Sequence, residues 1–139
     1  MQLEGHHMPP TDHAGLEVLT YDECIERLEH SQVGRLAFLA DGEVQIFPVN
    51  YRWHDGAVLF RTAPGTKLDA AFFKKVAAFE VDGWDSVFQT GWSVVAKGLV
   101  KAIDPTPEMG ELDLRPWAGP GRDDWVRIRP DEVTGRKIT

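Results

Sequence analysis

The sequence predicts a mainly β domain of the α+β class, in which one N-terminal helix precedes six or seven antiparallel strands. Successive apolar segments are joined by short turns, Asp41-Gly42 and His54-Asp55-Gly56, which favour antiparallel hairpins. Several segments are apolar at consecutive positions, so both of their faces need cover. A closed or nearly closed barrel would hide the strand edges and one of these faces.

The predicted helix begins with a capping box. Thr20 is followed three residues later by Glu23, and Cys24 and Leu28 continue at helical spacing to about His30. Residues 1–19 show no sustained periodicity and are expected to form a flexible tail, which leaves 20–139 as a single domain. Strands are predicted at 35–40, 43–53, 57–62, 76–82, 91–103 and 125–129, a last turn or strand at 133–138, and short helices at 66–73 and near 107–114.

Two residues indicate how the strands are placed. Pro48 lies inside a predicted strand and cannot donate a ladder hydrogen bond, so it should mark a sheet edge or a bulge. Gly98 lies inside another strand and indicates close approach by a second backbone. Because few helices are available to cover the second apolar face, we expect a partner chain to do so, and the sequence predicts a homodimer.

Composition disfavours several classes of function. The formal net charge is −7, from 22 acidic and 15 basic residues, which argues against binding to nucleic acid. There is no run of about 18 apolar residues and no secretory signal, so we expect a cytoplasmic protein that does not enter a membrane. Cys24 is the only cysteine, and no metal site is predicted, although His6, His7 and His13 could bind a metal ion nonspecifically.

The segment 61–67 has the residue types that bind a phosphate group. A predicted strand ends in Arg61-Thr62, a glycine-containing turn follows, and a helix begins at Thr66-Lys67. Arginine offers a planar fork of donors, threonine a hydroxyl, and a helix N-terminus free amides. The alternative is an exposed Arg and Lys at a strand–helix junction.

Two further segments are candidates for binding a flat ligand. Pro48-Val49-Asn50 would leave unpaired backbone groups along a strand edge, and Trp92-Ser93 combines a large ring with a hydroxyl. The structural alternatives are a bulged edge strand and a core strand with a packed tryptophan. Asn50, Trp92, Ser93, Arg115 and Trp117 are the available candidates for contacting a small-molecule substrate.

The order of these segments resembles the pyridoxamine 5′-phosphate oxidase-like family of flavin-binding split barrels, in its small flavin- or deazaflavin-dependent branch. The resemblance runs from about residue 21 to 139, on the segments 33–37, 48–51, 60–62, 65–67, 79–82, 92–95 with Gly98, and 133–136. It implies a six-stranded antiparallel split barrel that forms a homodimer with two flavins at the interface.

The resemblance also implies roles for particular residues. Arg61, Thr62 and Lys67, beside Thr66, would hold the flavin phosphate. The backbone of Pro48, Val49 and Asn50 would line the isoalloxazine ring, and Trp92 and Ser93 would lie beside a flavin, including one held mainly by the partner chain. No catalytic residue is indicated.

A departure from the family pattern narrows the expected activity. Pyridoxine-phosphate oxidases carry an Arg-x-His pair in their C-terminal part, whereas residues 115–125 contain no histidine and His54 is the last in the chain. We therefore expect an FMN-binding oxidoreductase that moves hydride or electrons to or from a small planar substrate, and not a vitamin B6 oxidase. The alternatives are an F420-dependent reductase, which the acidic composition makes less suitable, and a non-catalytic flavin- or haem-binding protein.

Overall fold

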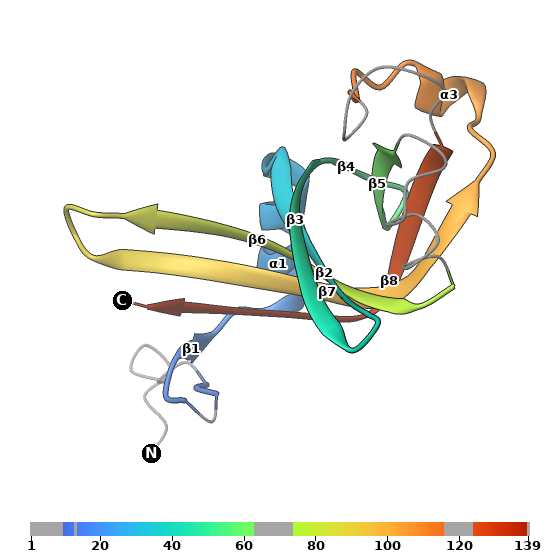
Figure 1. The fold of residues 1–139 in the computed structure, drawn as a ribbon. Helices are drawn as coiled ribbons and strands as arrows, with labels where there is room; N and C mark the ends of the chain where they lie inside the picture. Colours follow the sequence, from blue (N-terminus) through green and yellow to red (C-terminus); the bar gives the residue numbers. More distant parts are fainter. Residues whose placement is uncertain (1–9, 13, 63–73, 116–123, 139) are drawn as a thin grey trace.

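The computed structural model describes residues 10–12, 14–62, 74–115 and 124–138, which form one curled antiparallel sheet with few helices (Figure 1). The helices are α1 (Tyr21–His30) and α3 (Pro107–Gly110). The strands are β1 (Glu17–Val18), β2 (Val33–Ala40), β3 (Glu43–Asn50), β4 (Arg52–His54), β5 (Ala57–Thr62), β6 (Val76–Asp85), β7 (Thr90–Ile103) and β8 (Asp124–Ile138).

The strand order shows why the sheet curls. Hydrogen-bonded neighbours follow the order β3-β2-β6-β7-β8-β5-β4, with β1 added to β8. The two edge strands, β3 and β4, are separated in the chain by Tyr51 alone. The sheet must therefore bend until its two edges meet, although no ladder joins β3 to β4 in the described residues. The result is a split barrel, as the sequence predicts.

The apolar side chains form two clusters. The larger fills the inside of the barrel beneath α1, which contributes Cys24 and Leu28. The smaller lies on the other side of β5 and β8, where Leu59 and Trp125 pack against Met109 and Leu114. Both faces of β5 are therefore covered, which explains its continuous run of apolar residues.

Several sequence predictions are confirmed. Thr20 caps α1, with Glu23 N donating to Thr20 Oγ1 at 3.2 Å and Thr20 N donating to Glu23 Oε1 at 2.9 Å. Pro48 lies in an edge strand. A Cβ on Gly98 would lie 2.6 Å from Arg129 O, so another backbone does approach this glycine, at the bulge between Lys97 and Gly98.

Other element boundaries differ from the prediction. The strand expected at 43–53 divides at Tyr51, because its side chain turns inward and its hydroxyl donates to Leu28 O at 2.6 Å. The strands expected at 125–129 and 133–138 are one continuous strand. Pro130 lies opposite Gly98 at the bulge, where the pairing register shifts but the ladder continues on both sides. The strand expected at 76–82 continues to Asp85, and the helix expected near 107–114 ends at Gly110.

The N-terminal segment also differs from a flexible tail in the part that is described. Glu17 and Val18 pair with Lys137 and Arg136 of β8. Asp12 Oδ2 lies 3.1 Å from Arg136 Nη1, which ties this segment to the sheet. The helix predicted at 66–73 lies outside the described residues. Neither helix of the described chain is long and apolar enough to cross a membrane.

Candidate functional site

The last two residues of β5 have different surroundings. Arg61 is half-buried, its Nη1 donates to Leu114 O at 2.6 Å, and its guanidinium lies 5.1 Å from the Trp125 ring centroid. Thr62 points to the other face of the strand and is buried, yet within the described residues its Oγ1 has no hydrogen-bond partner. A buried hydroxyl without a partner costs about 1–3 kcal/mol, so a ligand acceptor at this position would relieve that cost.

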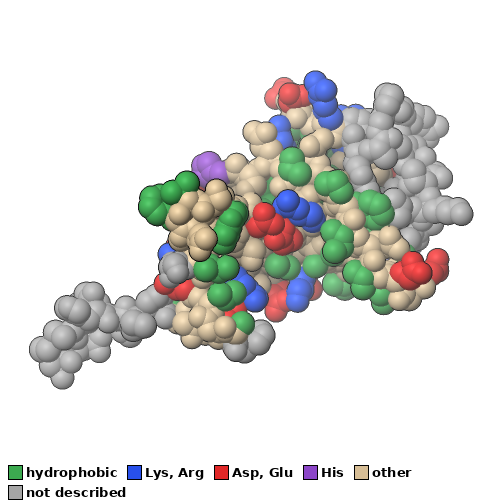
Figure 2. All heavy atoms as spheres, turned by 60° about the vertical axis from the view of Figure 1, so that its left-hand side comes forward, with side chains coloured by type: hydrophobic (Ala, Val, Ile, Leu, Met, Phe, Trp, Pro, Cys, Tyr) green, Lys and Arg blue, Asp and Glu red, His purple; other side chains and the backbone are tan. Residues whose placement is uncertain are grey.

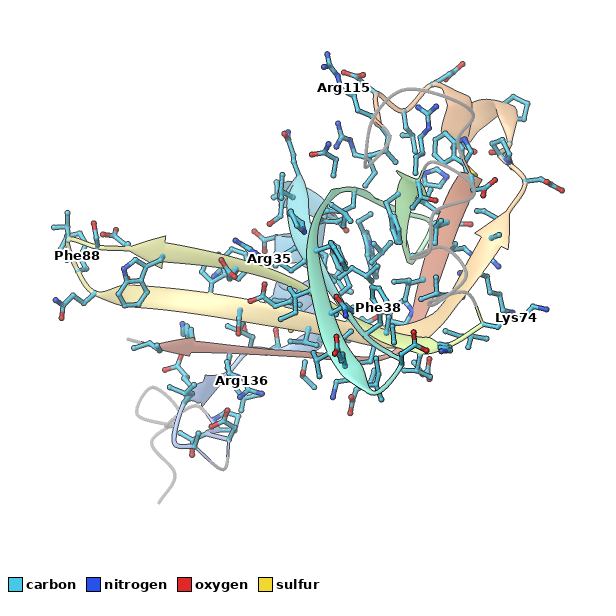
Figure 3. The ribbon with its side chains drawn as sticks, in the orientation of Figure 1. Arg35, Phe38, Lys74, Phe88, Arg115 and Arg136 are labelled. Atoms are coloured by element: carbon cyan, nitrogen blue, oxygen red, sulfur yellow. The ribbon has the colours of Figure 1, made fainter. Side chains whose placement is uncertain are left out.

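Two arginines from neighbouring strands hold the loop at residues 113–115. Arg52 Nη2 donates to Asp113 O at 3.0 Å, and Arg61 Nη1 donates to Leu114 O, the next carbonyl along. Arg115 lies at the same end of the molecule, exposed (Figure 3). Three guanidinium groups therefore gather at one end of a chain whose overall charge is negative, which favours an anionic ligand there.

A small hollow lies beside this loop. It has a volume of about 160 Å³, and its lining includes Asn50, Arg52, Asp113 and Arg115. Asn50 is thus brought next to the cationic end of the barrel, as a ring-contacting role would require. Val49 points into the core, so it could meet a ligand only through its backbone, on the edge of β3 that faces away from β2.

Trp92 and Ser93 lie far from this end of the chain. Arg61 pairs with Trp125 at the start of β8, whereas Trp92 pairs with Lys137 near the end of β8, 12 residues further on. That separation is about 40 Å along an extended strand. In Figure 1 the β6–β7 hairpin projects away from β5, and Figure 3 shows Phe88 at its tip and Arg115 at the opposite end. One chain therefore does not bring Trp92 or Ser93 to the flavin phosphate site predicted at Arg61 and Thr62.

The side chains of Trp92 and Ser93 point to opposite faces of the hairpin. Trp92 faces α1, lies over Gly83 on the paired strand, and has the Arg27 guanidinium 4.7 Å from its ring centroid. A hollow of about 340 Å³ lies on this side. Ser93 faces outward, in register with Asp82 and Arg136, beside a second hollow of about 230 Å³ that Trp84 also lines. Trp92 belongs to the lining of both hollows, whereas Ser93 belongs only to that of the second.

We call the face of the sheet that presents Ser93, Arg35 and Glu80 the outer face. It also carries two other predicted site residues. Cross-strand register places Pro48, Arg35, Glu80 and Val95 in one row across the sheet. Asn50 and Ser93 lie on the same face as this row, because side chains two residues apart in a strand share a face. Pro48, Asn50 and Ser93 are therefore presented together on one surface.

The remaining site predictions have different outcomes. Thr66 and Lys67, like Trp117, lie outside the described residues. Arg52 is a site residue that sequence reasoning missed, because it belongs to the part of the predicted strand 43–53 that turns away after Tyr51. Its only signal in the sequence was a positive charge close to Asn50.

The fold and this site define a class of protein: a split barrel of antiparallel strands, with a cationic end and an outer face that exposes several large apolar side chains. The sequence profile described as pyridoxamine 5′-phosphate oxidase matches residues 20–137. The chain belongs to this family.

Individual relatives agree with this assignment. The uncharacterized protein Rv0080 of Mycobacterium tuberculosis is 33% identical over 127 residues, which are 86% of this chain and 84% of that protein. Among solved structures, the FAD-binding protein of Mycobacterium smegmatis superposes with a TM-score of 0.77 at 34% identity, covering 87% of this chain and 97% of the other. A Corynebacterium glutamicum protein, named as a proposed pyridoxamine 5′-phosphate oxidase, has a TM-score of 0.75 at 33% identity, covering 89% and 98%.

Proposed function

We propose that this chain binds a flavin through Arg61 and Thr62 and works as an oxidoreductase on a small planar substrate. The observation that carries the proposal is the buried hydroxyl of Thr62, which has no partner within the described residues and belongs to the last residue of β5, next to Arg61 in sequence. The two side chains point to opposite faces of β5, so a phosphate that meets both would lie beyond the end of the strand. A phosphate oxygen accepts hydrogen bonds from both kinds of donor. Family membership and the likeness to the FAD-binding protein of M. smegmatis support the same ligand class.

The residues of the site would contact both the phosphate and the ring of a flavin. Arg61 and Thr62 would bind the phosphate, and Arg52 and Arg115 would add positive potential around it. The backbone of Pro48 and Val49 and the side chain of Asn50 would orient the ring. When bound, a flavin supplies the acceptance and donation of hydride or single electrons, so the protein needs no acid–base pair of its own to make it reactive.

The proposed site takes residues from two copies of the chain. Ser93 and Trp92 belong to a hairpin that extends away from the phosphate end of their own barrel. In a homodimer, that hairpin would reach the flavin held by the partner. Each of two sites would then combine Arg61 and Thr62 of one chain with the hairpin of the other.

Three flavin-type cofactors, FMN, FAD and F420, differ in what they attach to the ring. FMN is the smallest ligand that offers both the ring and the phosphate, and FAD carries the same phosphate with an adenylate attached. F420 carries a long acidic tail, which a chain of net charge −7 repels. We therefore expect FMN or FAD to bind more tightly than F420.

The experiment that tests the proposal is a titration of wild type and Thr62→Val with FMN, FAD and F420. Valine keeps the shape of threonine and removes the hydroxyl. We expect the dissociation constant for the preferred flavin to rise about 10- to 100-fold, which is the loss of one hydrogen bond to a charged group. We expect the unliganded variant to be at least as stable in urea as wild type, because the hydroxyl has no partner in the described chain.

Thr11→Val is the matched control, since Thr11 is exposed in the N-terminal segment. It should leave flavin affinity unchanged. Equal affinity for the flavin in wild type and Thr62→Val would show that the phosphate does not bind at Thr62. The absence of binding by all three flavins would overturn the proposed function as a whole.

A further inference from the structure

The outer face of the sheet carries many exposed apolar side chains. Val44, Ile46 and Val76 are 71%, 63% and 64% exposed, on β3 and β6. Val33, Leu39, Trp84 and Leu99 are further large apolar side chains that are exposed on these strands and on β2 and β7. Figure 2 shows hydrophobic side chains spread over one side of the molecule, with acidic and basic side chains between them. Monomeric proteins seldom leave so much apolar surface on one face.

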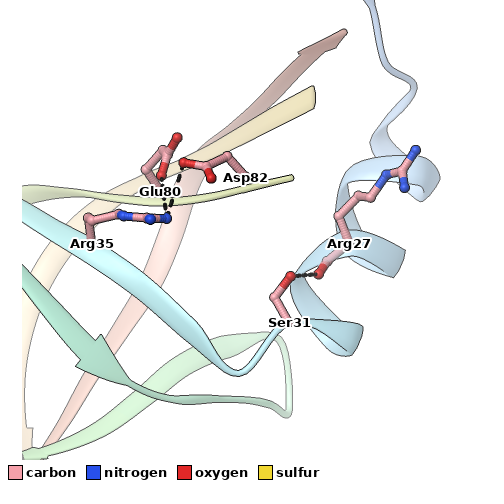
Figure 4. A network of polar contacts seen from close by, with 5 residues as sticks. All are labelled: Arg27, Ser31, Arg35, Glu80 and Asp82. Carbon is pink, nitrogen blue, oxygen red and sulfur yellow. Dashed lines mark hydrogen bonds and ion pairs between the residues drawn. The ribbon is translucent and has the colours of Figure 1, made fainter. Parts of the chain in front are cut away.

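Three charged residues lie in the middle of this face. Arg35 Nη1 lies 3.1 Å from Asp82 Oδ2, to which it donates a hydrogen bond, and 3.6 Å from Glu80 Oε1 (Figure 4). The second distance is too long for a hydrogen bond. Glu80 Oε1 is buried and has no hydrogen-bond partner within the described residues. When all three groups are ionised, this charged triad carries a net charge of −1.

The surroundings of Glu80 disfavour its ionised form. Burial, followed by hydrogen bonding to and repulsion from Asp82, raises the pKa of Glu80 to about 7, and Arg35 opposes the shift. Two further ion pairs lie on this face, and Lys101, Arg127 and Arg129 lie on it further along β7 and β8. Lys97 of β7 lies 3.5 Å from Glu132 of β8, and Arg136 of β8 lies 3.1 Å from Asp12. Arg35 is the cation in every ion pair that the described chain makes with Glu80 and Asp82.

We propose that a second copy of this chain covers the outer face, and that its docking makes Glu80 take up a proton, so the dimer is stronger in acid than in alkali. This inference rests on the homodimer of the proposed function and adds its regulation. A second copy suits the face because an isologous interface must be self-complementary. Apolar residues meet apolar residues in such an interface, and the triad contains both signs of charge.

The direction of the pH effect follows from the net charge of the triad. Docking removes water from two carboxylates that share one arginine, which costs free energy unless one carboxylate is neutral. The pKa of Glu80 is therefore higher in the dimer than in the free chain. Dimer affinity is greatest below the free-chain pKa, near 7, and falls as pH rises through the higher pKa of the dimer. Two protons are taken up per dimer, so the dissociation constant can change by up to about 100-fold per pH unit within that window.

The test is sedimentation with fluorescence detection, which follows association down to low concentration, on full-length wild type and Glu80→Gln at pH 6, 7, 8 and 9. We expect the dissociation constant of wild type to increase at least tenfold from pH 6 to pH 9. Glu80→Gln keeps the shape of the side chain in a permanently neutral form. We expect it to dimerise with the same dissociation constant at all four pH values.

Two further variants test whether the pH dependence belongs to Glu80. Glu29→Gln makes the same chemical change on an exposed position of α1, and it should keep the wild-type pH dependence. Asp82→Asn removes the repulsion instead of the titrating group, so its pH window should move to lower pH even if Glu80→Gln folds poorly. The described histidines, His30 of α1 and His54 of β4, are unchanged in all three variants.

The possible outcomes test the dimer and the proton uptake by Glu80 separately. A wild-type chain that is monomeric at every pH overturns both the dimer and the proton uptake. A wild-type dimer without pH dependence overturns the proton uptake and leaves the dimer standing. A pH dependence that persists in Glu80→Gln shows that another group titrates and also overturns it. Loss of the dependence in Glu80→Gln, with its retention in Glu29→Gln, supports the proposal whether or not a flavin binds.

Discussion

Single residues decide how closely the backbones of β7 and β8 approach each other. Gly98 lies at the bulge, where Arg129 O and Pro130 Cα occupy the positions nearest to an added Cβ, at 2.6 and 3.0 Å. Both neighbours are backbone atoms, so neither can rotate away as a side chain would. The glycine therefore permits the bulge without requiring an unusual backbone conformation.

We predict that Gly98→Ala lowers the free energy of unfolding by about 1–3 kcal/mol, the usual cost of overpacking a filled site. Equilibrium unfolding in urea measures this change. Gly110→Ala is the comparison, because a Cβ at Gly110 meets nothing within 4 Å and this residue ends α3. That variant should be as stable as wild type or slightly more stable. Equal stability of the two variants would contradict the steric argument.

Among the elements, α1 links the sequence pattern to the covered face of the sheet. Its first turn is closed by the reciprocal bonds between Thr20 and Glu23. Its inner side packs Cys24 close to Gly135 of β8, and burial raises the pKa of the Cys24 thiol. The helix thus covers one face of the sheet and leaves the outer face open.

Thr20→Ala should lower the free energy of unfolding by about 1 kcal/mol at pH 7, the typical contribution of an N-cap. The two hydrogen bonds with Thr20 also lower the pKa of Glu23. That part of the stability is complete above the pKa of Glu23 in the unfolded chain and is lost as pH falls through its lowered pKa in the folded chain. Urea unfolding at pH 7 and pH 3 should therefore show a larger difference between variant and wild type at pH 7.

The β6–β7 hairpin is a second element whose shape depends on unusual pairs. The Trp92 ring lies over Gly83, and the Trp84 ring lies over Gly91 on the opposite face. At the tip, Val87 N and Phe88 N donate to Asp85 Oδ1 at 3.0 and 3.2 Å. These contacts support the hairpin as an arm that projects from the barrel with exposed apolar side chains at its end.

At the scale of the whole molecule, the curl of the sheet and the length of this arm separate residues that the flavin proposal brings together. Arg61 and Thr62 lie at one end of the sheet, and Ser93 lies on the projecting arm. If the flavin site is shared between two chains, variants that damage different parts of it should complement each other, which a site within one chain would not allow.

We predict that two variants, each unable to bind flavin as a homodimer, recover binding when mixed. The first is Arg61→Ala/Thr62→Val, and the second is Ser93→Phe, which fills the outer hollow beside the arm. A heterodimer contains one intact composite site, so refolding an equal mixture should restore binding to about a quarter of all sites. Flavin fluorescence or equilibrium dialysis measures the recovered sites.

The same mixture with Trp92→Leu in place of Ser93→Phe identifies the face that meets the flavin, because Trp92 points toward α1. Thermal melting of each variant alone verifies that the chains fold. If mixing restores no binding with either partner, each flavin is held by one chain, and the composite site is wrong.

Local chemistry determined much of this fold from the sequence alone. The capping box at Thr20, the turn at Asp41-Gly42 and the edge position of Pro48 depend on neighbouring residues and on backbone donors, so they can be read without knowing the rest of the fold. Arg61 and Thr62 are adjacent in the chain, so the sequence can predict them as a phosphate-binding pair on the same local grounds. Gly98 could be interpreted in the same way, because a glycine inside a strand often marks a bulge or the close approach of another backbone.

Long-range pairing decided the rest. The inward turn of Tyr51, which splits the second strand, depends on a carbonyl of α1 that is 23 residues away in the chain. The placement of Arg52 beside Arg115, the distance between Thr62 and Ser93, and the grouping of Arg35, Glu80 and Asp82 all follow from which strands become neighbours. Strand order is settled by the free energy of burying whole faces, and residues that are far apart in sequence meet only once that burial is complete.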